Sequence, residues 1–154
     1  MTEPRWLDET EARVWRAYLE VRRDLSATLS RRLTQEAGLT EADYALLVPL
    51  SEAPDGLLRA RELSVLADWE RSRLSHQITR MEKRGLVARE ECPTDARGAM
   101  VRLTASGRAA IEAAAPGHVE AVRTYFFDAL APDEVELLDS LLRRILDGLP
   151  RDRG

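Results

Sequence analysis

The sequence predicts a mainly α-helical protein with one small β-hairpin. Apolar residues recur at helical spacing through most of the 154 residues. Alternating apolar and polar residues, which are typical of strands, occur only at 86–90 and 100–103. The length is sufficient for one domain with a hydrophobic core, and the single cysteine excludes an internal disulfide.

The first predicted helix covers residues 8–33. Its apolar stripe consists of Val14, Tyr18, Leu25, Leu29 and Leu33, widened by Trp15 and Val21. Gly38 is expected to end the helix, and Thr40 is expected to cap the next one in a capping box with Asp43. That second helix should end at the turn 54–56.

A short helix over 60–67, with Leu63 and Leu66 pointing inward, should precede a basic helix over 71–84. The buried face of the basic helix is expected to be formed by Leu74, Ile78 and Met81. Gly85 ends this helix, and the strands 86–90 and 100–103 follow, joined by a loop over 91–99.

Two more helices complete the prediction. Thr104 caps a helix of about 105–130, which Pro116-Gly117 should kink or interrupt. Its inward face should contain Ile111, Ala115, Val119, Val122, Phe126 and Leu130. The last helix, 133–148, is apolar over more than one stripe, which favours burial against a second copy of the chain. Residues from Pro150 onward are expected to form a frayed tail.

Charge is distributed unevenly along the chain. The net charge is −4, yet residues 71–108 hold nine basic and four acidic groups, a local charge of +5 that leaves −9 for the remainder. A positive segment within an acidic protein can bind a polyanion locally. Three helical segments followed by a hairpin describe a winged helix-turn-helix, whose second helix fits the DNA major groove.

The face of the basic helix opposite its apolar stripe is therefore the candidate DNA-binding surface. It supplies Ser72, Arg73, Ser75, His76, Gln77, Thr79 and Arg80, and Arg80, Lys83 and Arg84 are expected to help hold phosphates. In the hairpin loop, Arg97 is positioned to enter the minor groove and Asp95 to hold its guanidinium by a hydrogen bond. The alternative for the basic helix is a solvated polar face with no ligand. The alternative for the hairpin loop is an ordinary turn that needs Asp and Gly only for its conformation.

Three motifs resemble the MarR family of bacterial transcriptional regulators: Arg-x-Gly-Leu-Val after the basic helix, the Asp-x-Arg-Gly loop, and Leu-Thr-x-x-Gly before the next helix. The resemblance is clear over about 40–148 and departs most at Trp69-Glu70-Arg71. It implies an N-terminal dimerisation helix (1–35), a winged helix-turn-helix (40–104) and C-terminal dimerisation helices (105–149). It also implies a homodimer on an inverted-repeat operator in double-stranded DNA.

Many members of this family are released from DNA by small, often aromatic, anionic effectors. If this chain follows them, the available aromatic groups are Trp15, Tyr18, Tyr44, Trp69 and His118, and the possible counter-charges are Arg16, Arg22 and Arg123. Each aromatic group also has a packing interpretation, and a pH-sensing role is conceivable for His118.

The resulting expectation is a cytoplasmic transcriptional repressor with no membrane span, no metal and no cofactor. The rival is a winged-helix module that binds an acidic protein. An enzyme is not expected, because the sequence contains no phosphate-binding glycine loop and no His-Glu-x-x-His motif. Arg89 and Arg97 lie near Cys92 in the sequence, but Glu90 and Glu91 oppose their effect on the thiol, so a structural role is preferred to a redox role.

Overall fold

The computed structural model describes residues 2–150, with the backbone alone for 95–97; the expected frayed tail lies almost entirely outside this range. The elements in chain order are α1 (Glu9–Ala37), α2 (Glu41–Glu52), a 3₁₀ turn (Pro54–Gly56), β1 (Leu57–Arg59), α3 (Ala60–Ala67), α4 (Arg71–Lys83), β2 (Val87–Cys92), β3 (Asp95–Leu103), α5 (Ala105–Val122), a π-helical turn (Arg123–Phe127) and α6 (Pro132–Asp147). The predicted class, mainly α-helical with a β-hairpin wing, is confirmed.

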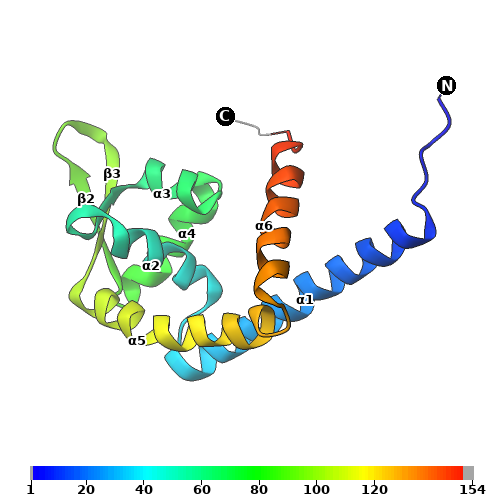
Figure 1. Ribbon diagram of the computed structural model, residues 1–154. Helices are drawn as coiled ribbons and strands as arrows, with labels where there is room; N and C mark the ends of the chain where they lie inside the picture. The colour runs from blue at the N-terminus through cyan, green and yellow to red at the C-terminus, as the bar shows by residue number, and fades with distance from the viewer. Residues whose placement is uncertain (1, 151–154) are drawn as a thin grey trace.

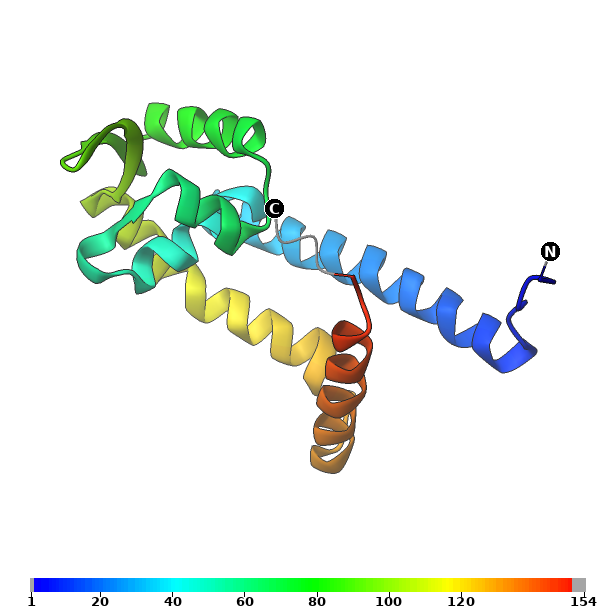
Figure 2. The ribbon, with the colours of Figure 1, turned by 90° about the horizontal axis from the view of Figure 1, so that it is seen from above.

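Figure 1 shows two parts. Helices α2, α3 and α4 gather beside the sheet, whereas α1 and α5 run side by side away from them and α6 stands at the far end of α5. Figure 2 shows that α1 extends well beyond the other helices at its N-terminal end. The structure is therefore a winged part attached to a helical arm.

The core lies in the winged part and where the arm joins it. Fully buried leucines of α2 and α3 pack with the apolar face of α4 and with the roots of β2 and β3. The prediction that Leu74, Ile78 and Met81 form the buried face of α4 is confirmed. Leu66 was predicted to point inward, but it is 63% exposed, because the short α3 presents Leu63 alone to the core.

The sheet has three antiparallel strands in the order β1-β3-β2. The sequence pattern did not predict β1, since three residues are too few to show an alternation. It also predicted a nine-residue loop over 91–99, whereas pairing continues to Cys92 and Asp95 and leaves only residues 93–94 as the turn. The wing is therefore a longer and better-paired hairpin than predicted.

Three predicted capping residues are confirmed, although α1 continues to Ala37, beyond its predicted end at residue 33. Gly38 ends α1 in the left-handed conformation, with φ of 66°. Thr40 and Asp43 form the predicted capping box at the start of α2. The Thr104 hydroxyl accepts a hydrogen bond from the backbone N–H of Gly107 at the start of α5. Helix α3 has the predicted bounds, 60–67.

Helix α5 differs from the prediction in two ways. It continues through Pro116 without interruption, and the irregularity lies instead in the π-helical turn that follows Val122. Its buried positions include Ala114 and Ala121, whereas Val119 of the predicted stripe is exposed. Small residues face α1 because the two helices approach closely over this length.

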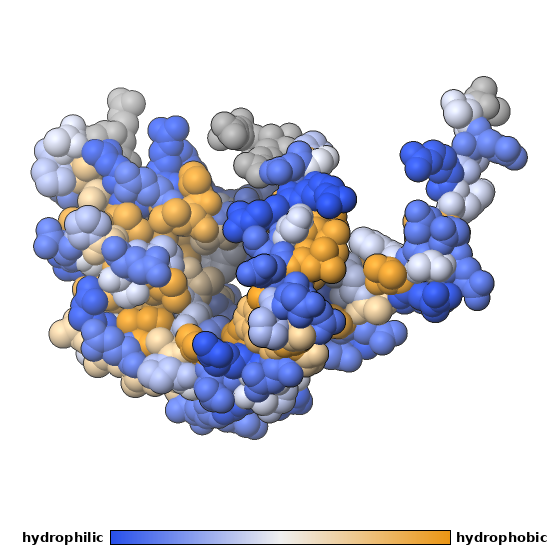
Figure 3. Space-filling model, in the orientation of Figure 1, coloured by the Kyte–Doolittle hydropathy of each residue, from blue (hydrophilic) through white to orange (hydrophobic). Residues whose placement is uncertain are grey.

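The arm exposes much apolar surface in the single chain. Helix α6 contains no buried residue, and the exposed apolar residues on its face and at its end are Leu137, Leu141, Leu142, Ile145, Leu146 and Leu149. Figure 3 shows this apolar face in orange along α6. The N-terminal half of α1 similarly exposes Val14, Trp15, Tyr18 and Val21. Within residues 2–150, no helix has the length and apolar character needed to span a lipid bilayer.

Candidate nucleic-acid interface

Helix α4 presents an exposed basic and hydroxyl-rich face. Of the residues predicted to contact DNA, those exposed on or just after this helix are Ser72, Arg73, Ser75, His76, Thr79, Arg80, Lys83 and Arg84. The only acidic residue on the helix is Glu82. The face is positively charged and carries hydrogen-bond donors of several lengths, as a DNA-contacting helix requires.

A concave basic surface lies between α4, the start of α3 and the wing. Its volume is about 430 Å³, and its polar lining includes Arg59, Arg61, Arg71, Arg89 and Ser75. No acidic residue is among its lining residues in the described part of the chain. This surface, called here the basic groove, adds arginines that the sequence analysis did not assign to the site. The signal was present in the Arg-Ala-Arg sequence at 59–61.

Arg89 ties the root of the wing to α4. Its Nη2 atom donates to the Ser75 carbonyl oxygen at 2.9 Å and to Thr79 Oγ1 at 3.0 Å. Its Nη1 atom donates to Glu82 Oε1 at 2.9 Å, and its backbone N–H donates to Glu82 Oε2. The hydroxyl of Thr79 is thus directed toward the wing root, and the wing and α4 form one continuous surface.

The hydrogen bonds from Arg89 lower the pKa of Glu82, with the backbone N–H making the largest contribution. A carboxyl group whose pKa is lowered on folding stabilises the folded state above its unfolded pKa, about 4.3. That contribution is lost as the pH falls through the folded-state value. We therefore expect the destabilisation caused by Glu82→Gln, measured by urea unfolding, to be larger at pH 6 than below about pH 4. Glu91→Gln, on the same strand as Arg89, is the control, and an effect of Glu82→Gln that does not change with pH would contradict the assignment.

Two further contacts hold the wing. Arg59 Nη2 donates to Thr94 Oγ1 at 3.2 Å, which links β1 to the turn of the hairpin. Arg102 of β3 forms an ion pair with Glu90 of the neighbouring strand β2. Asp95 and Arg97 belong to β3. The hydrogen bond predicted between them involves side chains outside the described part of the structure.

One predicted DNA contact is on the wrong face, and another already has partners within the protein. Gln77 was placed on the exposed face, but it is 7% exposed and its Nε2 atom donates to Asp43 Oδ1 at 2.7 Å. Arg84 is partly exposed, but its guanidinium donates to Asp43 Oδ2 at 2.6 Å and to the Gly38 carbonyl oxygen at 2.8 Å. Gln77 lies three residues after Leu74 and four before Met81, so helical geometry places it beside the buried stripe. Its polar character misled the prediction.

The residues predicted to bind an effector separate into two groups. Tyr44, Trp69 and His118 line one open groove of about 410 Å³ between α1, α2, α4 and α5, together with Arg73. The ring centroids of Tyr44 and His118 lie 4.4 Å apart, and the Arg73 guanidinium lies 4.0 Å from the Trp69 ring centroid. Burial raises the pKa of Tyr44. We call this the aromatic groove.

The remaining predicted residues lie elsewhere. Trp15 and Tyr18 contact each other on the exposed part of α1, with ring centroids 5.5 Å apart. Neither they nor the suggested counter-charges Arg16, Arg22 and Arg123 line the aromatic groove. Arg73 was predicted only as a DNA contact. It lies on the exposed face of α4 and also lines the aromatic groove.

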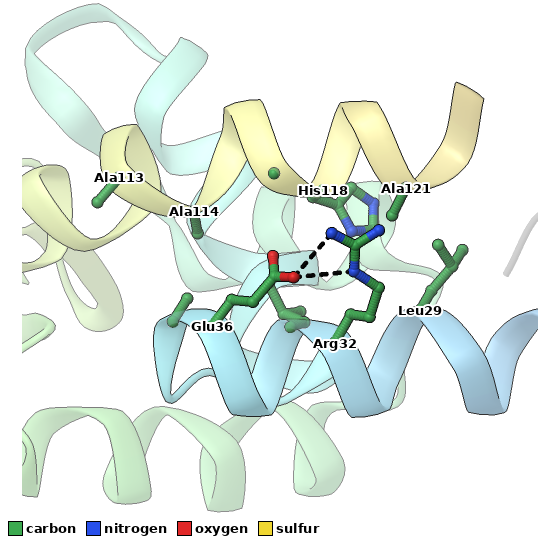
Figure 4. Close-up of a pocket in the computed structure, with 10 residues that line it drawn as sticks. Leu29, Arg32, Glu36, Ala113, Ala114, His118 and Ala121 are labelled. Atoms are coloured by element: carbon green, nitrogen blue, oxygen red, sulfur yellow. Dashed lines mark hydrogen bonds and ion pairs between the residues drawn. The ribbon is translucent and has the colours of Figure 1, made fainter. Parts of the chain in front are cut away.

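A second, smaller cavity lies between α1 and α5. Its volume is about 40 Å³, which is enough for a water molecule but not for an aromatic ligand. Figure 4 shows Arg32 and Glu36 of α1 paired beneath α5, with His118 directed toward them. The nitrogen–oxygen distance of this pair is 2.7 Å. The pair closes the gap that the small residues of α5 leave.

Cys92 is buried at the end of β2, with its Sγ atom 3.4 Å from Thr94 Oγ1. A buried thiol fits the structural role preferred from the sequence. Among residues 2–150, excluding the side chains of 95–97, no cluster of three or more His, Cys, Asp or Glu residues is arranged to hold a metal ion.

Comparison with known proteins agrees with this geometry. The MarR family model matches residues 37–98, which cover α2 to the wing. Transcriptional regulator HosA of Escherichia coli O111:H- is 33% identical over 109 residues, which cover 71% of this chain and 78% of that protein. The chain belongs to the MarR family.

Solved structures of MarR family members extend the similarity to the arm. Sco3205 from Streptomyces coelicolor, solved in complex with DNA, is 43% identical with a TM-score of 0.92, and the match covers 100% of this chain and 96% of that one. AbsC, a MarR family regulator from the same organism, is 44% identical with a TM-score of 0.88, over 94% of this chain and 97% of that one. The arrangement of the winged part on its arm is thus shared with other MarR proteins.

Proposed function

We propose that this protein is a transcriptional regulator that binds double-stranded DNA as a homodimer and represses by occupying an inverted-repeat operator. The observation that carries the proposal is the basic groove beside the exposed face of α4. One helix fits the major groove, and a basic surface beside it can contact the phosphates that flank the groove. The complex of Sco3205 with DNA supports this assignment.

In this arrangement α4 is the recognition helix. Base edges are contacted from its exposed face by Ser72, Arg73, Ser75, His76 and Arg80, with Lys83 on phosphate. Arg59, Arg61 and Arg71 hold phosphates from the basic groove, and Arg97 of the wing enters the minor groove. Thr79 contributes by holding Arg89 rather than by contacting DNA.

A homodimer is proposed because the apolar faces of α6 and of the N-terminal half of α1 have no partner within the described part of the chain. An obligate dimer of this kind buries roughly 2,000 Å² or more. A two-fold dimer presents two recognition helices related by symmetry, so the operator has matching symmetry.

The aromatic groove is the proposed effector site. It lies between the arm and α4, and it combines the rings of Tyr44, Trp69 and His118 with the positive charge of Arg73. Glu41 also lines the groove. The rings and Arg73 suit a small aromatic ligand whose anionic group lies beside Arg73 and away from Glu41. Because Arg73 also lies on the recognition helix, occupancy of the groove acts directly on DNA binding.

The DNA-binding role is tested by removing charge from the basic groove. We expect Arg61→Ala and Arg71→Ala each to weaken binding to a mixed-sequence duplex by roughly 1–2 kcal/mol and to reduce the salt slope by about one. Fluorescence anisotropy at several salt concentrations measures both. Arg23→Ala, which removes an exposed arginine of α1, is the charge-matched control. Indifference of the wild-type protein to duplex would favour binding of an acidic protein instead.

A further inference from the structure

A buried carboxylate joins the recognition helix to the corner between α1 and α2. Asp43 is 1% exposed, and it and Gln77 are the only buried polar or charged residues in the described part of the chain. Asp43 Oδ1 accepts a hydrogen bond from Gln77 Nε2 at 2.7 Å. Asp43 Oδ2 accepts from Arg84 Nη1 at 2.6 Å and from the backbone N–H of Thr40 at 2.9 Å. One side chain thus holds α4 at two points.

Arg84 extends this network to the arm. Its Nη2 atom donates to the carbonyl oxygen of Gly38, the residue that caps α1. Gln77 and Arg84 are seven residues apart, which is about two turns of helix. Attachment at two points separated by about two turns restrains both the tilt and the rotation of α4, in addition to its apolar packing.

The chemistry of the contact also matters. The apolar stripe of α4 packs against the core, and the hydrophobic effect that drives this packing is not directional. Hydrogen bonds to a buried carboxylate are directional and lose strength quickly when the donor moves. A buried charged network is a weak source of stability, so a role in fixing one geometry is the one considered for it.

We infer that Asp43, Gln77 and Arg84 are positioning residues that set the spacing between operator half-sites. The inference rests on the proposed DNA-binding homodimer. Helix α1 belongs to the arm that carries the dimer surface, so holding α4 to the end of α1 fixes the distance between the two recognition helices. One base pair displaces a half-site by about 3.4 Å, so α4 must be held more tightly than this for a single spacing to be preferred.

The experiment is selection of bound duplexes from a random-sequence library by the full-length protein. The Gln77→Leu variant removes the donor to Asp43 and keeps a side chain of similar size. Gln35→Leu is the matched control, since Gln35 is exposed on α1 near the same corner. Circular dichroism and sedimentation establish that each variant is folded and dimeric.

The wild-type protein and Gln35→Leu should select one half-site sequence at one spacing. Gln77→Leu should select the same half-site sequence, because Gln77 does not reach the exposed face. Its preference for the best spacing over spacings one base pair longer or shorter should fall about tenfold, as expected for loss of a hydrogen bond to a charged group. A loss of stability alone would not change the spacing.

A reciprocal exchange provides a second test that does not depend on Gln77→Leu. Gln77→Glu alone places two carboxylates together and should broaden the spacing. Adding Asp43→Asn restores an amide–carboxylate pair at this contact with the donor reversed, although Arg84 then faces a neutral side chain, so the preference for one spacing should return in part. Unchanged spacing in Gln77→Leu, or no recovery at all in the exchange, would overturn the inference. Failure of the wild-type protein to select any repeat would instead overturn the proposed function.

Discussion

Replacement of Ile145 by glutamate is expected to convert the protein from a dimer into a monomer. Ile145 is 61% exposed in the single chain and lies on the apolar face of α6. Burying a carboxylate without a partner costs several kcal/mol, and in a two-fold interface the cost applies twice. The winged part should remain folded, because α6 contributes no residue to its core. Sedimentation equilibrium at micromolar concentration measures the change.

The same variant should lose affinity for an inverted-repeat duplex by about 100-fold or more, since a monomer loses the effective concentration that the second recognition helix provides. Ser140→Glu is the control, because it adds the same charge on the opposite, polar side of α6. A variant that remains dimeric, or that keeps wild-type affinity for the repeat, would show that α6 is not the dimer surface.

Gly107→Ala is expected to destabilise the fold by about 3 kcal/mol or more. Gly107 lies in the first turn of α5, where the helix crosses the start of β2. A Cβ atom there would overlap the backbone carbonyl oxygen of Leu86 and would lie 2.7 Å from Leu103 Cδ1. The carbonyl cannot rotate away as a side chain can, so α5 and the wing root must separate.

Urea unfolding followed by circular dichroism measures this loss. Gly148→Ala is the control, because a Cβ atom there meets its nearest neighbour at 3.5 Å, an ordinary contact. The expected result is a large decrease in the unfolding midpoint for Gly107→Ala and little change for the control. Equal stability of the two variants would mean that α5 does not pack against Leu86 as described.

The helix boundaries could be predicted because they depend on neighbouring residues in the chain. Gly38, Thr40 and Thr104 act through hydrogen bonds within a few positions, and sequence spacing reveals them directly. Strand β1 could not be predicted in the same way, because its pairing partner β3 lies more than forty residues away. Helix α5 passes Pro116 because packing against α1 outweighs one missing hydrogen bond.

The part of the candidate site that depends on neighbouring residues could also be predicted, whereas the part that depends on distant residues could not. The basic character of α4 is a local property, so its exposed face was identified from composition and helical spacing. The role of Gln77 depends on Asp43, thirty-four positions earlier, which a helical pattern alone does not bring into view. The aromatic groove joins Tyr44 of α2, His118 of α5 and Trp69 of the segment between α3 and α4, and only the fold separates them from Trp15 and Tyr18.

The central claim is that two copies of α4 bind one inverted-repeat DNA site. The most direct measurement is a pull-down of sheared genomic DNA with purified protein at about 0.15 M salt. We predict enriched fragments that share an inverted repeat with half-site centres about one helical turn apart. Enrichment no greater than in a control without protein, with duplex bound only at low salt, would contradict it.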